Sequence, residues 1–117
     1  MCMGMILMGH IKDVRFAAYD NYCGMVHLTS VDPYYIGKNV KCSHEGEDME
    51  LFQLTIQSYY ELRHIEQGCS DKVINNFYET NHRAVENAKT LYKTKALDRL
   101  AEKNAPCSEA YDLIMTM

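Results

Sequence analysis

The chain contains no tryptophan, only two prolines and no long run of apolar residues. No stretch approaches the ~20 apolar residues that a membrane-spanning helix needs. The apolar residues 1–9 have no basic residue before them, and no small-residue cleavage site follows, as a secretory signal would require. We therefore expect no membrane association and no secretion.

The cysteines lack the features of a disulfide framework, because their number is odd and their spacing is wide. They are Cys2, Cys23, Cys42, Cys69 and Cys107. Reduced thiols are typical of cytoplasmic proteins, whereas small secreted domains are rich in disulfides. The cysteine pattern thus predicts a cytoplasmic protein with free thiols.

Sequence motifs of common enzymes are also missing. The chain has no phosphate-binding loop, dinucleotide fingerprint, nucleophile elbow or HExxH motif. A catalytic cysteine activated by a neighbouring histidine stays open as an alternative, since an imidazole can lower a thiol pKa. Nothing in the sequence positions an oxyanion donor, so we expect no enzymatic activity and no cofactor.

Zinc is the cofactor that the composition leaves open, because Cys and His are its usual ligands. One conceivable tetrahedral site consists of Cys23, His27, Cys42 and His44. A rival set combines Cys42 and His44 with His64 and Cys69. Neither set contains a CxxC pair, so a small zinc-binding domain that contacts nucleic acid is the alternative rather than the main hypothesis.

Negative charge is concentrated in one segment of the chain. The formal net charge is −4, and residues 43–71 alone carry seven acidic residues and one arginine. The acidic cluster at the start of this segment is Glu45, Glu47, Asp48 and Glu50. It either forms a solvated loop or docks on a basic partner surface, as a mimic of nucleic-acid phosphates would. A chain-wide basic footprint for direct nucleic-acid binding is absent.

Tyrosine is unusually frequent, with nine residues against three phenylalanines. Two adjacent pairs, Tyr34–Tyr35 and Tyr59–Tyr60, cannot both point inward from a strand, because neighbouring side chains alternate between its faces. Exposed tyrosine is enriched at protein interfaces. These four residues and the acidic cluster are therefore the candidate partner-binding residues.

Periodicity predicts strands in the first half of the chain. Residues 5–9, 14–18 and 25–31 are expected strands, and residues 34–42 are expected to form a tight hairpin. Residues 49–67 fit either a strand followed by a short helix or one buried helix.

Helical spacing dominates the second half. Residues 73–92 are expected to form a long helix that starts near Ser70 or Asp71 and buries Ala84. A helix restarting at Thr94 and a last short helix after Ser108 follow. We therefore expect one α+β domain over residues 1–117, with a small antiparallel sheet of three or four strands covered on one face by the C-terminal helices.

Together these features predict a small acidic protein that inhibits or regulates a larger protein partner with a basic surface. The exposed tyrosines would equally serve self-association into a homo-oligomer. Short acidic chains without catalytic motifs are typical of phage or viral proteins that act on host machinery, including anti-defence proteins, and we expect a protein of that type. The alternatives are the zinc-binding domain and a small enzyme with a Cys/His site.

Free thiols give the first testable prediction. All five cysteines should react with a thiol reagent after the chain is unfolded without reductant, because no disulfide is expected. The measurement is a thiol count by absorbance or mass spectrometry. A count of one reactive thiol would instead indicate two disulfides and an oxidising compartment.

Overall fold

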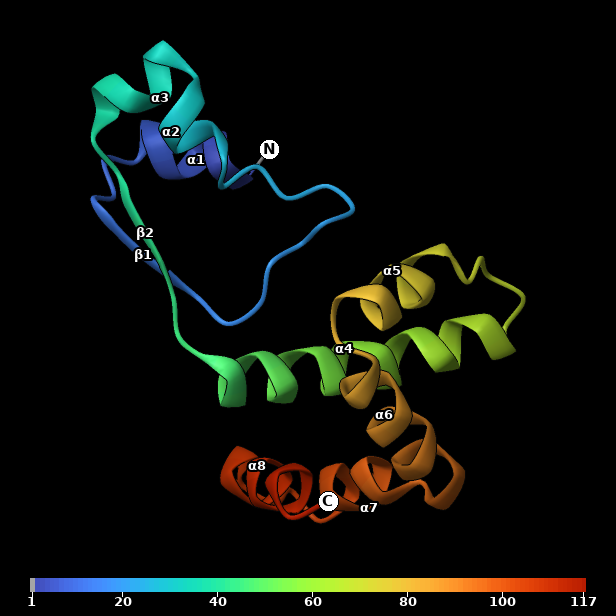
Figure 1. Ribbon diagram of the computed structural model, residues 1–117. Coiled ribbons are helices and arrows are strands. Elements are labelled where there is room, and N and C mark those ends of the chain that lie inside the picture. Colours follow the sequence, from blue (N-terminus) through green and yellow to red (C-terminus); the bar gives the residue numbers. More distant parts are fainter. Residues whose placement is uncertain (1) are drawn as a thin grey trace. The chain divides into compact units, whose positions relative to one another are not determined.

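The computed structural model describes residues 2–117, which form two compact units that meet in the chain between residues 46 and 47 (Figure 1). About 65% of the chain is helical and 7% is strand, with one two-stranded parallel sheet. The expected α+β fold with three or four antiparallel strands is therefore wrong. The expectation of a single domain stays a prediction.

The N-terminal unit alternates short helices with two four-residue strands. Its elements are α1 (Cys2–Met8), β1 (Asp13–Phe16), α2 (Leu28–Val31), α3 (Pro33–Lys38) and β2 (Lys41–His44). The strands pair in parallel, with Asp13 opposite Lys41 and Phe16 opposite His44. A parallel pair needs a long crossover, and residues 17–40, which include α2 and α3, provide it.

Three segments expected as strands in this unit are wholly or partly helical. The apolar start forms α1, whose Met3 and Leu7 lie four residues apart on one buried face, and methionine and leucine are strong helix formers. The predicted hairpin fails because Asp32–Pro33 starts α3: the Asp32 carboxylate accepts hydrogen bonds from the Tyr34 and Tyr35 amides. Proline at the first helical position fits this start.

The expected strand at residues 25–31 also contains a single helical turn, α2. Thr29 and Ser30 donate their hydroxyl hydrogens to the carbonyls of Val26 and His27, three residues earlier. Such local hydrogen bonds compete with strand formation. Of the expected strands, the structure retains β1 and the second arm of the predicted hairpin, whose residues 41 and 42 lie in β2.

The C-terminal unit is an all-helical array around one long helix. Its elements are α4 (Glu47–Glu66), α5 (Lys72–Thr80), α6 (His82–Thr94), α7 (Ala96–Glu102) and α8 (Cys107–Met115). The first turn of α4 is acidic and its last turn contains Arg63 and His64, which matches the helix dipole. This charge distribution and the burial of one face settle the ambiguity of residues 49–67 in favour of a single helix.

The core of this unit lies where α6 packs against α4. From α6 it takes Ala84, Val85, Ala88 and Leu91, all at most 4% exposed. From α4 it takes Leu51, Leu54, Thr55, Ser58 and Tyr59. Thr55 satisfies its hydroxyl within the helix by donating to the Leu51 carbonyl at 2.6 Å.

The predicted long helix of residues 73–92 is two helices. Asn81 interrupts it with an extended backbone, at φ −155° and ψ 87°, and its side chain accepts a hydrogen bond from the Ala84 amide. Asparagine favours helix starts because its short side chain reaches the free backbone N–H groups. The expected burial of Ala84 is nevertheless confirmed, with an exposed fraction of 0%.

A polar contact joins α4 to α7. The Tyr59 hydroxyl donates a hydrogen bond of 2.8 Å to Asp98, and Arg63 forms an ion pair with the same carboxylate. Burial, and then the hydrogen bond to Asp98, raise the pKa of Tyr59 to about 12. Tyr59 is 5% exposed, so it acts as a core residue with a satisfied hydroxyl.

The described cysteines are free, and no disulfide joins any of the five. No helix formed by residues 2–117 has both the length and the apolar character needed to cross a membrane.

Burial of Ala84 leads to a stability prediction. Ala84→Asp places an unpaired charge against α4 and should lower the free energy of unfolding by about 3 kcal/mol. Thr90→Asp is the matched control, since Thr90 lies on the exposed face of the same helix, and it should cost less than about 1 kcal/mol. Urea unfolding followed by circular dichroism measures both, and equal losses would contradict the packing of α6.

Tyr59 leads to a pH prediction. Its pKa is raised above the ordinary value of 10, so the stability that its protonated form contributes is complete below pH 10 and is lost as pH rises toward about 12. Subtracting the phenolate absorbance of Tyr59→Phe from that of the unmodified chain isolates this group. A midpoint near 10 in the difference titration would contradict the buried hydrogen bond to Asp98.

Candidate functional site

The acidic cluster proposed from the sequence is divided between the two units. Glu45 follows β2 in the N-terminal unit and lies 3.7 Å from Arg15, as an exposed ion pair. Glu47, Asp48 and Glu50 form the first turn of α4. There they line a hollow of about 220 Å³ together with Leu51, Asn81 and Arg83. Asn81 donates a hydrogen bond of 3.3 Å to Glu50, so part of this charge is already engaged within the unit.

The four candidate tyrosines differ in exposure. Tyr34 on α3 is 56% exposed, and the Lys38 ammonium lies 5.2 Å from the centre of its ring. Tyr35 is half-buried, with its ring centre 6.3 Å from that of Tyr34. On α4, Tyr60 is 49% exposed whereas Tyr59 is buried. Tyr34 and Tyr60 therefore present accessible rings, and Tyr59 does not.

The conceivable metal ligands are not gathered into a site. Within residues 2–117, no group of three or more His, Cys, Asp or Glu side chains is placed to hold a metal ion. Cys23 lies in the loop after β1, where its thiol donates to the Asp20 carboxylate at 3.1 Å. Cys42 lies on β2 opposite Val14.

Both thiols have environments that work against a reactive thiolate. The hydrogen bond to Asp20, and next the negative charge of that carboxylate, raise the pKa of Cys23. Burial, and next the charge of Asp13, raise the pKa of Cys42. Nucleophilic cysteines require the opposite shift.

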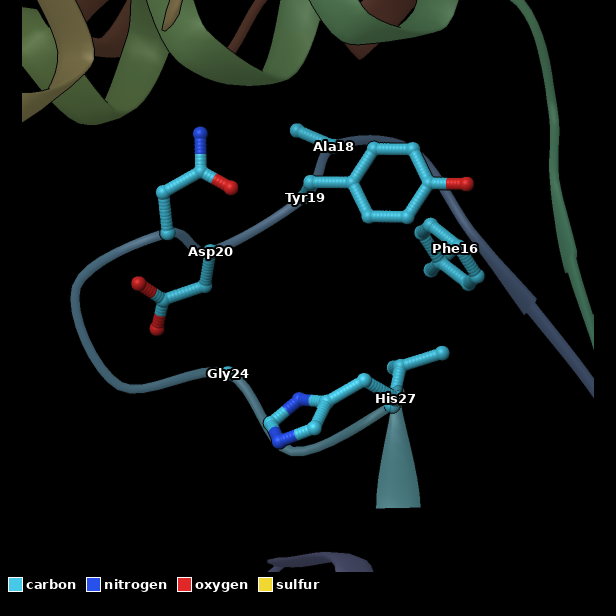
Figure 2. Close-up of a pocket in the computed structure, with 8 residues that line it drawn as sticks. Phe16, Ala18, Tyr19, Asp20, Gly24 and His27 are labelled. Carbon is cyan, nitrogen blue, oxygen red and sulfur yellow. The ribbon is translucent and has the colours of Figure 1, made fainter. Parts of the chain in front are cut away.

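A cavity that sequence reasoning missed lies inside the loop that follows β1. Its volume is about 290 Å³, near the lower end of the ~300–1,000 Å³ range of ligand sites. The lining residues are Phe16, Ala18, Tyr19, Asp20, Asn21, Gly24, Val26 and His27. Figure 2 shows the Phe16 and Tyr19 rings, the Asp20 carboxylate and the His27 imidazole around one opening.

The shape of this loop follows from Asp20 and Gly24. One oxygen of the Asp20 carboxylate accepts hydrogen bonds from the backbone N–H groups of Tyr22 and Cys23, at 3.0 and 3.1 Å. The Gly24 amide then donates to the Asp20 carbonyl at 2.8 Å. A Cβ atom at position 24 would lie 2.4 Å from that carbonyl oxygen, so only glycine permits the turn.

Aromatic rings form one wall of the cavity. The ring centres of Phe16 and Tyr19 are 4.8 Å apart in an edge-to-face arrangement. The Tyr19 ring stacks on His44, with centres 5.2 Å apart and planes inclined by 14°. Because β2 places His44 directly opposite Phe16, the parallel sheet holds this aromatic cluster together.

The cavity also contains a fixed negative charge. Burial pushes the pKa of Asp20 upward, but the hydrogen bonds from Cys23 and Tyr22 outweigh it and hold that pKa below its ordinary value. Hydrogen bonds to the charged form of a carboxylate always act in this direction. Asp20 is therefore ionised at neutral pH.

The sequence did contain a signal for this site. Residues Asp20 to Gly24 have the composition of a turn, and Phe16, one of the two aromatic residues before them, falls within the strand expected over residues 14–18. An Asx turn that follows closely spaced aromatic residues places a carboxylate next to their rings. Comparison of the chain with protein-family models, characterised proteins and solved structures found no match.

Proposed function

We propose that this protein is a non-enzymatic interaction protein that inhibits or regulates a larger protein partner with a basic surface. One observation carries the proposal: the N-terminal unit leaves nine of its large apolar and tyrosine side chains exposed to solvent. Its buried residues are only Met3 and Leu7 among those described. Its exposed large side chains are Met5, Met8, Ile11, Tyr19, Tyr22, Met25, Val31, Tyr34 and Ile36.

Exposed apolar and aromatic side chains provide the contact area from which a binding surface can be built. Tyrosine and methionine are enriched at interfaces, and three tyrosines and three methionines belong to the exposed set. A ring such as that of Tyr34 offers a large rigid contact area with little entropy to lose. The N-terminal unit therefore carries the chemistry of a binding face.

The small size of this unit points the same way. Units of about 40 residues usually need disulfides, a metal ion or association to be stable. The cysteines are free, and the described residues offer no metal group. Association with a partner would bury the exposed side chains and supply the missing stability.

Charge indicates the kind of partner. The chain carries a net charge of −4, and Glu47, Asp48 and Glu50 concentrate negative charge on the first turn of α4. Opposite charge on a partner accelerates encounter at low ionic strength. A basic partner surface is the one that this distribution favours.

The experiment captures partners from an extract of the source organism and measures association and dissociation rates with the purified partner. Tyr34→Ala combined with Ile36→Ala should raise the dissociation rate about tenfold, because both exposed side chains would become buried anchors. Glu47→Lys with Asp48→Lys should chiefly slow association, and added salt should have the same effect.

Two controls accompany these variants. Glu109→Lys with Asp112→Lys makes the same charge change on α8, near another helix start, and Tyr78→Ala removes an exposed tyrosine from the C-terminal unit. Both should leave the rates within about twofold of the unmodified chain. A partner affinity that is indifferent to salt, to the acidic reversal and to the loss of Tyr34 and Ile36 would refute the proposal.

A further inference from the structure

The cavity after β1 combines three elements that suit one class of ligand: aromatic rings, an ionised carboxylate and a small volume that is open to solvent. We propose that it binds the cationic head of a lysine or arginine side chain, presented by the basic surface of the partner. The inference rests on the proposed function for the source of the cation. The kind of cation, an alkylammonium or guanidinium group, is inferred from the residues that line the cavity.

The carboxylate sets the sign of the ligand charge. Asp20 lines the cavity, and no lysine or arginine of residues 2–117 forms an ion pair with it. Two cations of this unit are engaged elsewhere: Arg15 lies beside Glu45, and the Lys12 ammonium donates to the Lys38 carbonyl at 2.8 Å. No lysine or arginine lines the cavity, so the Asp20 carboxylate disfavours an anionic ligand.

The aromatic wall selects the kind of cation. Faces of aromatic rings attract ammonium and guanidinium groups, most strongly where water is partly excluded. The Phe16 and Tyr19 rings border the same opening as the Asp20 carboxylate (Figure 2). A flexible aliphatic stem with a charged end matches this combination, because the stem packs on the rings while the head reaches the carboxylate.

The site is organised before any ligand arrives. Asp20 is held by two backbone amides, Gly24 closes the turn, and His44 supports the Tyr19 ring by stacking. A charge fixed in this way costs little ordering on binding. A volume of about 290 Å³ suits one side chain rather than a drug-sized molecule.

The test titrates the full chain with three capped tripeptides, followed by ¹H–¹⁵N NMR. They are acetyl-Gly-Lys-Gly-amide, acetyl-Gly-Arg-Gly-amide and the uncharged acetyl-Gly-norleucine-Gly-amide. The two cationic peptides should shift the resonances of residues 16–27 saturably, and the norleucine peptide should bind about tenfold more weakly. Equal binding of all three, or no saturable shift in this loop, would overturn the proposal.

Variants separate charge from fold. Asp20→Asn keeps an oxygen that can accept the same two amide hydrogens but removes the charge, so affinity should fall about tenfold. Asp32→Asn is the matched control, because Asp32 likewise accepts from two backbone amides, at the start of α3, and does not line the cavity. Tyr19→Leu removes an exposed ring and should weaken cation binding even if Asp20→Asn perturbs the loop. Unchanged affinity in Tyr19→Leu would contradict the aromatic role.

Competition identifies the source of the cation. Butylammonium should displace the captured partner if the partner inserts a side chain here, and Asp20→Asn should weaken that complex. Tripeptide binding without displacement of the partner would overturn the assignment to a partner side chain. If the partner binds normally but none of the tripeptides binds, the cation site is refuted and the proposed function is not. If the tripeptides bind but no protein partner is captured, the proposed function is refuted and the cation site is not.

Discussion

Close packing of α6 on α4 is the constraint on which the C-terminal unit depends. The contact uses small side chains, with Ala84, Ala88, Thr55 and Ser58 all fully buried. Small residues allow two helix backbones to approach closely, and interiors at native density have no room for added atoms. α4 also makes a polar contact with α7. The Tyr59 side chain is buried, and its hydroxyl donates a hydrogen bond to Asp98.

The N-terminal unit is organised differently, around backbone hydrogen bonds rather than a core. The Asp20 and Asp32 side chains each accept hydrogen bonds from two backbone amides. Asp20 thereby stabilises the turn after β1, and Asp32 caps the start of α3. The two parallel strands then fix the register that places His44 beside Phe16. With only Met3 and Leu7 buried among its described residues, this unit leaves many apolar side chains exposed.

The two units therefore differ in how much of their side-chain chemistry is accessible to solvent. The helical unit is a packed scaffold whose buried tyrosine serves stability, although the sequence suggested a role for it in binding. The N-terminal unit offers exposed rings and, in the loop after β1, a cavity lined by the ionised Asp20. The acidic first turn of α4 and the Asp20 cavity are two separate places where negative charge is concentrated.

The sequence by itself determined the features that depend on a few neighbouring residues. The helical spacing that buries Ala84, the free cysteines, the strand at Val14 and Phe16 and the turn at Asp20–Gly24 were all predictable, because periodicity and turn chemistry are local. Tertiary structure decided the parallel pairing of β1 with β2, the burial of Tyr59 rather than Tyr60, and the meeting of Phe16, Tyr19 and Asp20 around a cavity. These depend on which segments pack together: a short apolar run fits a strand or a helix equally well until its partners settle which side chains are buried.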